Sequence, residues 1–202
     1  MLKDGIISKN IESEREDMLK DKNIVLGICG GIAAYKACEI ISILKKSGAN
    51  VDVIMTKNAT EFITPLTVST LAKSRAIVNE FEIPDIYSPE HIALAKKADL
   101  FLVAPATANI IGKVANGIAD DMLSTTIMAC TAKVVFAPAM NDNMYKNKIV
   151  QDNISKLKEY GYQFVEPAEG ILACGTSGVG RLESPKRIVE VVDQLLEENG
   201  NV

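Results

Sequence analysis

The sequence lacks tryptophan, has a single histidine, and spreads its four cysteines along the chain without any CxxC pair. One histidine, His91, without a Cys/His cluster argues against a zinc site. The cysteines at positions 29, 38, 130 and 174 do not form the pattern of a disulfide framework, and their scatter is typical of a reducing compartment. The expected location is therefore the cytoplasm.

Basic clusters and long apolar runs are also missing. The 22 Lys and Arg residues are dispersed, the net charge is -4, and no apolar run reaches the length that crosses a bilayer. Residues 1–22 are polar and charged and lack the apolar stretch of a signal peptide. We therefore expect neither nucleic acid nor a membrane as a partner.

The composition that is present is that of an ordinary globular protein. Hydrophobic residues make up 48% of the chain and charged residues 24%, and 202 residues suit one domain with its own core. We expect residues 1–22 to be a charged extension, either a frayed helix or a disordered arm. Residues 23–198 then form the folded domain.

From residue 23 onward, short β-branched runs alternate with amphipathic helical stretches. The runs 100–104 and 134–137 are continuously apolar, which is typical of strands buried on both faces of a parallel sheet. The alternation predicts an α/β fold: a three-layer, doubly wound parallel sheet that is Rossmann-like. The expected strands are 24–28, 51–55, 100–104, 134–137 and 163–165, and the expected helices are 32–47, 65–72, 91–97, 110–115, 122–130, 144–160 and 185–198.

Ligands of such sheets bind beyond the carboxyl ends of the strands. The first expected strand runs into Gly30 and Gly31, and a glycine-rich turn lets backbone N–H groups meet an anion. The spacing differs from GxGxxG, and the second strand ends in Thr56 and Asn58, where an NAD site needs an acidic residue. A phosphate of a mononucleotide fits these groups better. The alternative, equally weighted, is that the two glycines only allow close packing of helix and strand.

Two later segments have simpler interpretations. Small residues after the strand 100–104 let a flat ring approach the backbone, but capping of the next helix is the favoured interpretation of Thr107. In the segment 116–124, Asp120 or Asp121 as a helix N-cap explains the pattern without any function.

Three residues could carry chemistry. His91 stands near a helix start, which favours a neutral imidazole that accepts a proton, although a lone histidine is more often structural. Asn141 follows the last core strand, where its amide could bind a carboxylate or a flavin edge, but Asn is also a common turn and cap residue. Cys174 stands in a glycine-rich segment that is expected to be a mobile flap, so its thiol is either a ligand-facing group or an incidental surface cysteine.

Five stretches together resemble the homo-oligomeric flavin-containing cysteine decarboxylases: GGIAAYK (30–36), SPEHIAL (88–94), PATANIIGKVANGIADDMLS (105–124), PAMNDNM (138–144) and ACGTSGVGRL (173–182). The resemblance covers about residues 23–198. It implies a Rossmann-like flavoprotein that uses FMN to remove CO2 from the cysteine end of 4'-phosphopantothenoylcysteine, a step in coenzyme A synthesis. The departures are small: Tyr145 stands where the family often has Trp, and Lys96 where plant relatives carry Arg.

The resemblance also assigns roles. His91, Asn141 and Cys174 are the implied active-site residues, with Cys174 on a flexible clamp over residues 166–184. The implied FMN contacts are Gly30, Gly31, Ile32, Ala33, Thr56, Asn58, Phe62, Pro105, Ala106, Thr107, Asn109, Ser124 and Met140. The implied substrate contacts are Lys96, Asn141, Met144, Ala173, Gly178 and Arg181. No metal is implied.

The implied reaction oxidises the cysteinyl side chain to a thioaldehyde, so that CO2 can leave and an ene-thiolate remains. Asn141 would bind the carboxylate, His91 would orient the substrate or act as base, and Cys174 would supply a proton as the product is reduced. The family forms homotrimers or dodecamers built from them. A neighbouring copy can cover a flat cofactor on a small domain, and we expect segment 105–124 near that interface.

Other members of the fold remain as alternatives. Decarboxylases of peptides that end in cysteine share the PxMN motif, but the clamp with Cys174 favours the pantothenoyl substrate. Flavin prenyltransferases lack the set of His91, Asn141 and Cys174. Regulatory relatives that inhibit phosphatases have lost catalytic residues, whereas all three are present here. A stand-alone enzyme and one half of a bifunctional chain both stay open.

Overall fold

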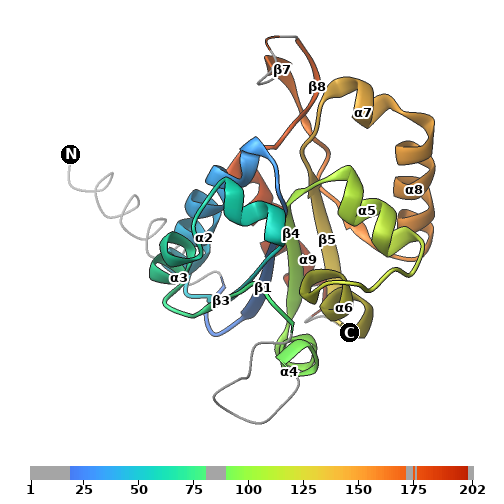
Figure 1. Ribbon diagram of the computed structural model, residues 1–202. Coiled ribbons are helices and arrows are strands. Elements are labelled where there is room, and N and C mark those ends of the chain that lie inside the picture. Colours follow the sequence, from blue (N-terminus) through green and yellow to red (C-terminus); the bar gives the residue numbers. More distant parts are fainter. Residues whose placement is uncertain (1–18, 81–89, 172–174, 176, 200–202) are drawn as a thin grey trace, which may run out of the picture.

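The computed structural model describes residues 19–80, 90–171, 175 and 177–199. Within these residues, parallel strands form one six-stranded sheet in the order β3-β2-β1-β4-β5-β6 (Figure 1). The order reverses between β1 and β4, which is the switch point of a doubly wound sheet. The expected α/β fold is confirmed. The strands are β1 (Asn23–Ile28), β2 (Asn50–Met55), β3 (Ala76–Ile77), β4 (Leu100–Ala106), β5 (Lys133–Pro138) and β6 (Gln163–Phe164).

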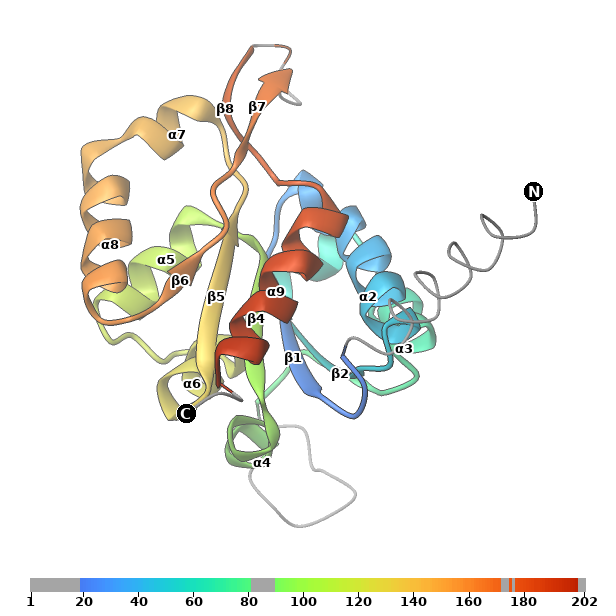
Figure 2. The ribbon, with the colours of Figure 1, turned by 180° about the vertical axis from the view of Figure 1, so that it is seen from behind.

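Helices cover both faces of the sheet and form two separate hydrophobic clusters with it. Figure 2 shows α9 and α2 crossing one face of β1 and β4. One layer consists of α2 (Ala37–Lys46), α3 (Pro65–Ala72) and α9 (Pro185–Asn199). The other contains α5 (Ala108–Ala115), α6 (Met122–Ala129) and α8 (Lys148–Glu159).

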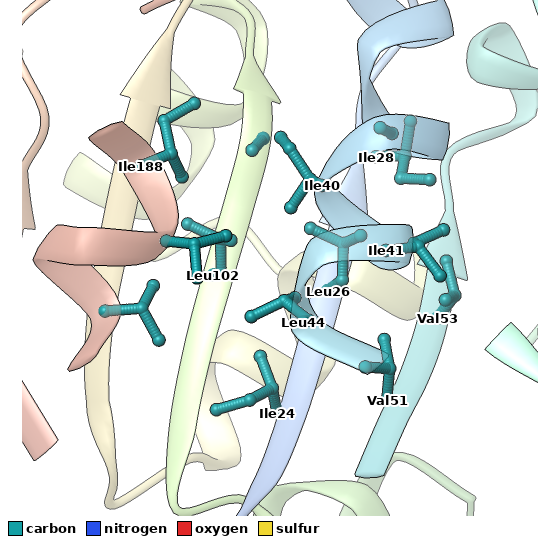
Figure 3. Packing of buried hydrophobic residues seen from close by; sticks show 14 of the residues in the cluster. Ile24, Leu26, Ile28, Ile40, Ile41, Leu44, Val51, Val53, Leu102 and Ile188 are labelled. Carbon is teal, nitrogen blue, oxygen red and sulfur yellow. The ribbon is translucent and has the colours of Figure 1, made fainter. Parts of the chain in front are cut away.

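The strands supply both clusters because their side chains alternate between the two faces. Along β4, all seven residues are buried; Leu100 and Leu102 join the cluster with α2 and α9, and Phe101 and Val103 join the other. This double burial explains why the run reads as continuously apolar. Figure 3 shows the first cluster, with side chains of α2 and α9 packed on three strands: Ile24, Leu26, Ile28, Ile40, Ile41, Leu44, Val51, Val53, Leu102 and Ile188.

Two expected helices are broken in the structure. The stretch 32–47 divides into a 3-10 helix, η1 (Ile32–Lys36), and α2, since a tight turn starts the element directly after Gly31. The stretch 144–160 divides into α7 (Asp142–Lys146) and α8 at Asn147. The Asn147 backbone leaves the helical region, and its side chain accepts a hydrogen bond from the N–H of Ile149 at 2.9 Å. Asn competes with the helix in this way wherever it can act as a cap.

A hairpin outside the main sheet was not predicted. Strands β7 (Ala168–Ile171) and β8 (Ser177–Arg181) pair antiparallel, and Figures 1 and 2 show them projecting above the carboxyl edge of the sheet. They occupy most of the segment 166–184 that was expected to be a clamp. The 3-10 helix η2 (Lys57–Glu61) and the short β3 were also missed.

The described part of the chain begins in a packed segment. Leu19 is buried in the core, and its N–H donates to the carbonyl of Ser47 at 2.9 Å. The carbonyl of Lys22 accepts from the N–H of Asn50 at 2.8 Å. Residues 19–22 therefore belong to the folded unit, ahead of the expected boundary at residue 23, whereas the rest of the expected extension lies outside the described residues.

Candidate active site

A cavity of about 650 Å³ opens at the carboxyl edge of the sheet, beside the switch point. The segments that follow β1, β4 and β5 form its walls, together with η1, α7 and the end of β8. Its volume suits a cofactor or a small-molecule ligand. The lining residues are Gly30, Gly31, Ile32, Ala33, Tyr35, Lys36, Pro105, Thr107, Ala108, Ala139, Met140, Asn141, Met144, Gly180, Arg181 and Leu182.

The two glycines after β1 have different roles. A Cβ on Gly30 would lie 2.4 Å from the Cβ of Asn58 and 2.7 Å from its carbonyl carbon, so packing excludes any side chain there. A Cβ on Gly31 would meet only the Cγ2 of Thr107, at 3.9 Å. The missing side chain of Gly31 therefore leaves room in the cavity. The packing interpretation applies to Gly30, and the ligand interpretation fits Gly31.

Two helices begin at this cavity without a side-chain cap. Gly31, which has no side chain, precedes η1, and Thr107 precedes α5 without its side chain accepting a hydrogen bond from the first turn. The simpler interpretation of Thr107, as a capping side chain, is therefore wrong. Lys36, which precedes α2, makes no side-chain cap either, whereas five other helices are capped by the side chain that precedes them: Thr56, Thr64, Asp121, Asn141 and Asn147. Uncapped N–H groups at a cavity wall suit an anion such as a phosphate.

Several expected FMN contacts lie off the cavity wall. Thr56 caps η2 by accepting from the N–H of Ala59 at 3.2 Å, and the exposed Asn58 touches the site only through its contact with Gly30. Phe62 ends η2 with half its side chain exposed, Asn109 is exposed on α5, and the side chain of Ala106 is buried in β4.

Ser124 is fully buried beside the start of α6. Asp121 caps this helix by accepting from the N–H of Ser124 at 2.8 Å, and the Ser124 hydroxyl accepts in return from the N–H of Asp121 at 3.2 Å. The N-cap interpretation of Asp121 is confirmed. Lys113 lies 2.6 Å from Asp120 and 2.7 Å from Asp121. Burial raises the pKa of the Asp121 carboxyl, but hydrogen bonds from Lys113 and Ser124 outweigh it, so the pKa is lowered overall.

We expect Asp121→Ala to lower the free energy of unfolding by roughly 1–2 kcal/mol, the usual effect of removing an N-cap. Because the folded pKa lies below the unfolded one, the carboxylate's contribution is present above the unfolded pKa and is lost as pH falls through the folded value. Asp121→Asn keeps a capping side chain and should cost less. Urea unfolding at pH 7 measures both, and equal stability of Asp121→Ala and wild type would contradict the assignment.

Asn141 caps a helix and also lies on the cavity wall. Its Oδ1 accepts a hydrogen bond from the N–H of Asn143 at 2.9 Å, which caps α7, and the residue lines the cavity. Strand β8 holds this loop, because the N–H of Met140 donates to the carbonyl of Gly180 at 2.9 Å. A Cβ on Gly180 would lie 2.3 Å from the Met140 carbonyl oxygen, and one on Gly178 would lie 2.8 Å from the Cβ of Asp142. The hairpin thus lies directly against the Asn141 loop, and glycine is required for that approach.

His91 and Lys96 lie away from this cavity. Both belong to α4 (Glu90–Lys97), which Figure 1 shows at the opposite edge of the sheet from α7 and β8. Just after α4, the carboxylate of Asp99 accepts from the N–H of Asn23 at 2.7 Å, at the amino end of β1. The Nδ1 of His91 lies 3.8 Å from the carboxylate of Glu80. One chain therefore does not bring His91 to Asn141, since the length of the sheet, roughly 20 Å, separates the two edges.

Of the remaining expected residues, three lie at or next to the cavity and two lie outside the described residues. Met144 and Arg181 line the cavity, and Gly178 lies behind it against α7. Ala173 and Cys174 lie outside the described residues. Six lining residues were not predicted from the sequence: Tyr35, Lys36, Ala108, Ala139, Gly180 and Leu182. A signal existed for the first two, because they stand in the quoted stretch GGIAAYK, and a 3-10 turn puts residues three apart, such as Ile32 and Tyr35, on one side.

Cys29 is buried directly after β1, and its thiol is not a nucleophile. Burial raises the pKa of its thiol to about 12, although hydrogen bonds with the backbone and side chain of Thr107 act in the opposite direction. A thiol with this pKa stays protonated and unreactive at neutral pH. Within the described residues, no group of three or more His, Cys, Asp or Glu side chains could hold a metal ion.

Comparison with known proteins shows the family. The family model described as Flavoprotein matches residues 12–197, and the chain belongs to this family. It is 52% identical over 175 residues to the coenzyme A biosynthesis bifunctional protein CoaBC of Borreliella burgdorferi, covering 87% of this chain but only 45% of that protein. It is 43% identical over 177 residues to a Streptococcus mutans protein named "Probable phosphopantothenoylcysteine decarboxylase", covering 87% of this chain and 99% of the relative.

The fold is also that of a solved flavoenzyme. The crystal structure of the FMN-dependent cysteine decarboxylase SpaF matches with a TM-score of 0.78 and 29% identity, over 90% of this chain and 99% of that one. The chain thus spans about half the length of the bifunctional relative and nearly all of the shorter one.

In the described part of the chain, no helix is long and apolar enough to cross a membrane.

Proposed function

We propose that this chain binds FMN and catalyses the decarboxylation of 4'-phosphopantothenoylcysteine to 4'-phosphopantetheine, a step in coenzyme A synthesis. The observation that carries the proposal is the cavity at the switch point, which has Asn141 on its wall beside the Gly31 turn and the uncapped start of α5. The names of the shorter relative and of the solved structure support a decarboxylation, and the name of the bifunctional relative supports a step in coenzyme A synthesis.

The cavity residues fit FMN. The open space over Gly31 and the N–H groups at the starts of η1 and α5 suit its phosphate. Small and apolar side chains, Pro105, Ala108 and Met140, suit its flat ring. When bound, FMN supplies reversible two-electron oxidation and reduction.

The side chains of this chain supply binding and proton transfer. The Asn141 amide would bind the substrate carboxylate that leaves as CO2, and its cap to Asn143 fixes the position of that amide. His91 would orient the substrate or accept its proton. Cys174 would deliver a proton to carbon as the product is restored. We also propose that residues 166–184 act as a clamp, which the contact of β8 with the Asn141 loop supports.

The separation of His91 from Asn141 supports a homo-oligomeric site. Since the two residues lie at opposite edges of one chain, a second copy must supply His91 if both act on one substrate. A homotrimer, or a dodecamer built from trimers, provides such repeated contacts between different patches of identical subunits. Exposed apolar side chains beside the cavity, Ile32 and Tyr35, are available for a neighbouring copy to cover.

Mixed subunits test this arrangement. His91→Asn and Asn141→Asp should each be inactive alone, with FMN bound. Co-expressed in equal amounts, they should regain up to about a quarter of wild-type activity, because about one site in four pairs an intact His91 from one copy with an intact Asn141 from another. No recovery in mixed oligomers confirmed by mass spectrometry would contradict a shared site.

The proposed function is tested on the purified protein. We expect a yellow protein whose released flavin has the mass of FMN, and CO2 release from 4'-phosphopantothenoylcysteine in preference to a peptide that ends in cysteine. A protein that cannot be loaded with FMN, or that prefers the peptide, would refute it.

We also propose a cytoplasmic location. Cys29, Cys38 and Cys130 are free thiols, which supports this proposal.

A further inference from the structure

Two cations line the same end of the cavity, and the proposed chemistry does not use them. Lys36 is the last residue of η1, and Arg181 is the last residue of β8. Neither forms a salt bridge with a carboxylate in the part of the chain that the structure describes. Two cations on one cavity wall, without a carboxylate partner among the described residues, indicate that the ligand carries the matching negative charge.

Lys36 has a hydrogen-bond partner, whereas Arg181 is exposed and lies against the hairpin. The Nζ of Lys36 donates to the carbonyl of Leu182 at 3.3 Å, which uses one of the three N–H donors of the ammonium. The guanidinium of Arg181 lies over the backbone of β7, because a Cβ on Gly170 would meet its terminal nitrogen at 3.3 Å. Partial burial and then the charge of Arg181 lower the pKa of Lys36, while Glu39 and Glu183 act in the opposite direction. The positive charges thus repel each other at this wall, and an anion between them would relieve the repulsion.

The cations lie a short distance from Asn141 along β8. The carbonyl of Gly180 accepts from Met140, next to Asn141, and the carbonyl of Leu182 accepts from Lys36. Two residues of chain span at most about 7 Å. Strand β8 therefore leads from the Asn141 loop to the end of η1, so a single ligand in the cavity can contact both Asn141 and the cations.

This position differs from the one that suits the cofactor phosphate. Gly31 lies at the start of η1, where N–H groups are available, whereas Lys36 lies at its end, where the chain continues into α2 and the N–H of Ala37 already donates to the carbonyls of Ala34 and Tyr35. Five residues of 3-10 helix separate the two ends by about 10 Å. The cavity therefore has two places for a phosphomonoester, one formed by backbone N–H groups and one by side-chain cations.

We propose that Lys36 and Arg181 bind the terminal phosphate of the substrate and so select phosphorylated over unphosphorylated pantothenoylcysteine. The inference rests on the proposed function, since that substrate has its carboxylate at one end and its phosphate at the other. The two cations match the phosphate charge, and the fork of Arg181 fits two phosphate oxygens.

The test compares both substrates in four proteins: wild type, Lys36→Met, Arg181→Met and Lys46→Met. Lys46 is exposed at the far end of α2 and serves as the control, because its loss changes the net charge equally without touching the cavity. We expect the ratio of kcat/KM for phosphorylated over unphosphorylated substrate to fall about tenfold to a hundredfold in each cavity variant. The control should keep the wild-type ratio, and FMN per subunit should be equal in all four.

Each other outcome has one meaning. An unchanged ratio in both cavity variants, with both substrates still turned over, overturns the inference alone. Loss of bound FMN with an unchanged ratio also overturns it, because the cations would then hold the cofactor phosphate. Wild type that decarboxylates neither substrate overturns the proposed function, and the inference with it. Thermal unfolding of each variant, with a midpoint close to that of wild type, shows that a lowered ratio reflects binding and not misfolding.

Discussion

Asn141→Asp is expected to reduce CO2 release from 4'-phosphopantothenoylcysteine by at least about a hundredfold, because a carboxylate facing the substrate carboxylate costs several kcal/mol. The fold should survive, since Asp accepts the cap hydrogen bond from the N–H of Asn143 as well as Asn does. FMN content should also be unchanged. The measurement is the steady-state rate of CO2 release, together with the flavin absorbance of each protein.

Asn147→Asp is the matched control. Asn147 caps α8 through the same kind of hydrogen bond, at the same distance of 2.9 Å, and lies off the cavity wall. The control introduces the same charge five residues of helix away, so it should keep normal activity. Near-normal activity of Asn141→Asp would remove Asn141 from the site, and equal losses in both variants would point to a general charge effect.

Cys174→Ser is expected to keep the loss of CO2 and to block the later step that restores the saturated thiol. In the proposed reaction, loss of CO2 would depend on Asn141 and His91, whereas restoring a saturated thiol needs a proton delivered to carbon, and a thiol is a far better acid than a serine hydroxyl. The variant should still release CO2 but form a product about two hydrogens lighter than 4'-phosphopantetheine. Mass spectrometry of the product measures this difference.

Cys38→Ser provides the comparison for the clamp cysteine. Cys38 is a free thiol on α2, away from the cavity wall, so its replacement should give the normal product. If Cys174→Ser makes the saturated product at an unchanged rate, Cys174 is an incidental surface cysteine. The alternative interpretation of that residue would then be correct.

The sheet could be predicted because a strand that is buried on both faces is apolar at every position. β4 is apolar at every position, and α3 begins and ends at the expected residues, with Thr64 capping it and Pro65 at its start. The break at Asn147 could not be predicted, because the apolar periodicity continues across it and only the cap geometry ends the helix.

The hairpin and its contact with Asn141 depend on long-range packing. Strands β7 and β8 are short and contain three glycines, so they carry no strand signal of their own. Gly180 is needed because Met140 lies against it, and that neighbour is distant in sequence. No local pattern encodes such a contact.

The site was predicted in part. The motifs placed Gly31, Thr107 and Asn141 on one edge, because each lies within three residues of the end of a strand of a parallel sheet. His91 could have been placed from the same rule, since α4 precedes β4 and must therefore deliver the chain to the amino edge. The motifs implied a chemical role for His91 but not its distance from Asn141. Lys36 and Arg181 stood within quoted motifs, yet only the fold brings them to one wall.

The proposed reaction is a decarboxylation without net oxidation of the substrate. The ratio of CO2 to saturated product measures this directly. Wild-type protein is incubated with 4'-phosphopantothenoylcysteine labelled with carbon-13 at the cysteine carboxylate, while labelled CO2, the product mass and dissolved oxygen are followed together. We predict one CO2 for each saturated 4'-phosphopantetheine, with no oxygen consumed. Labelled CO2 accompanied by a product two hydrogens lighter and by oxygen consumption, or no labelled CO2 at all from an FMN-loaded protein, would contradict the account.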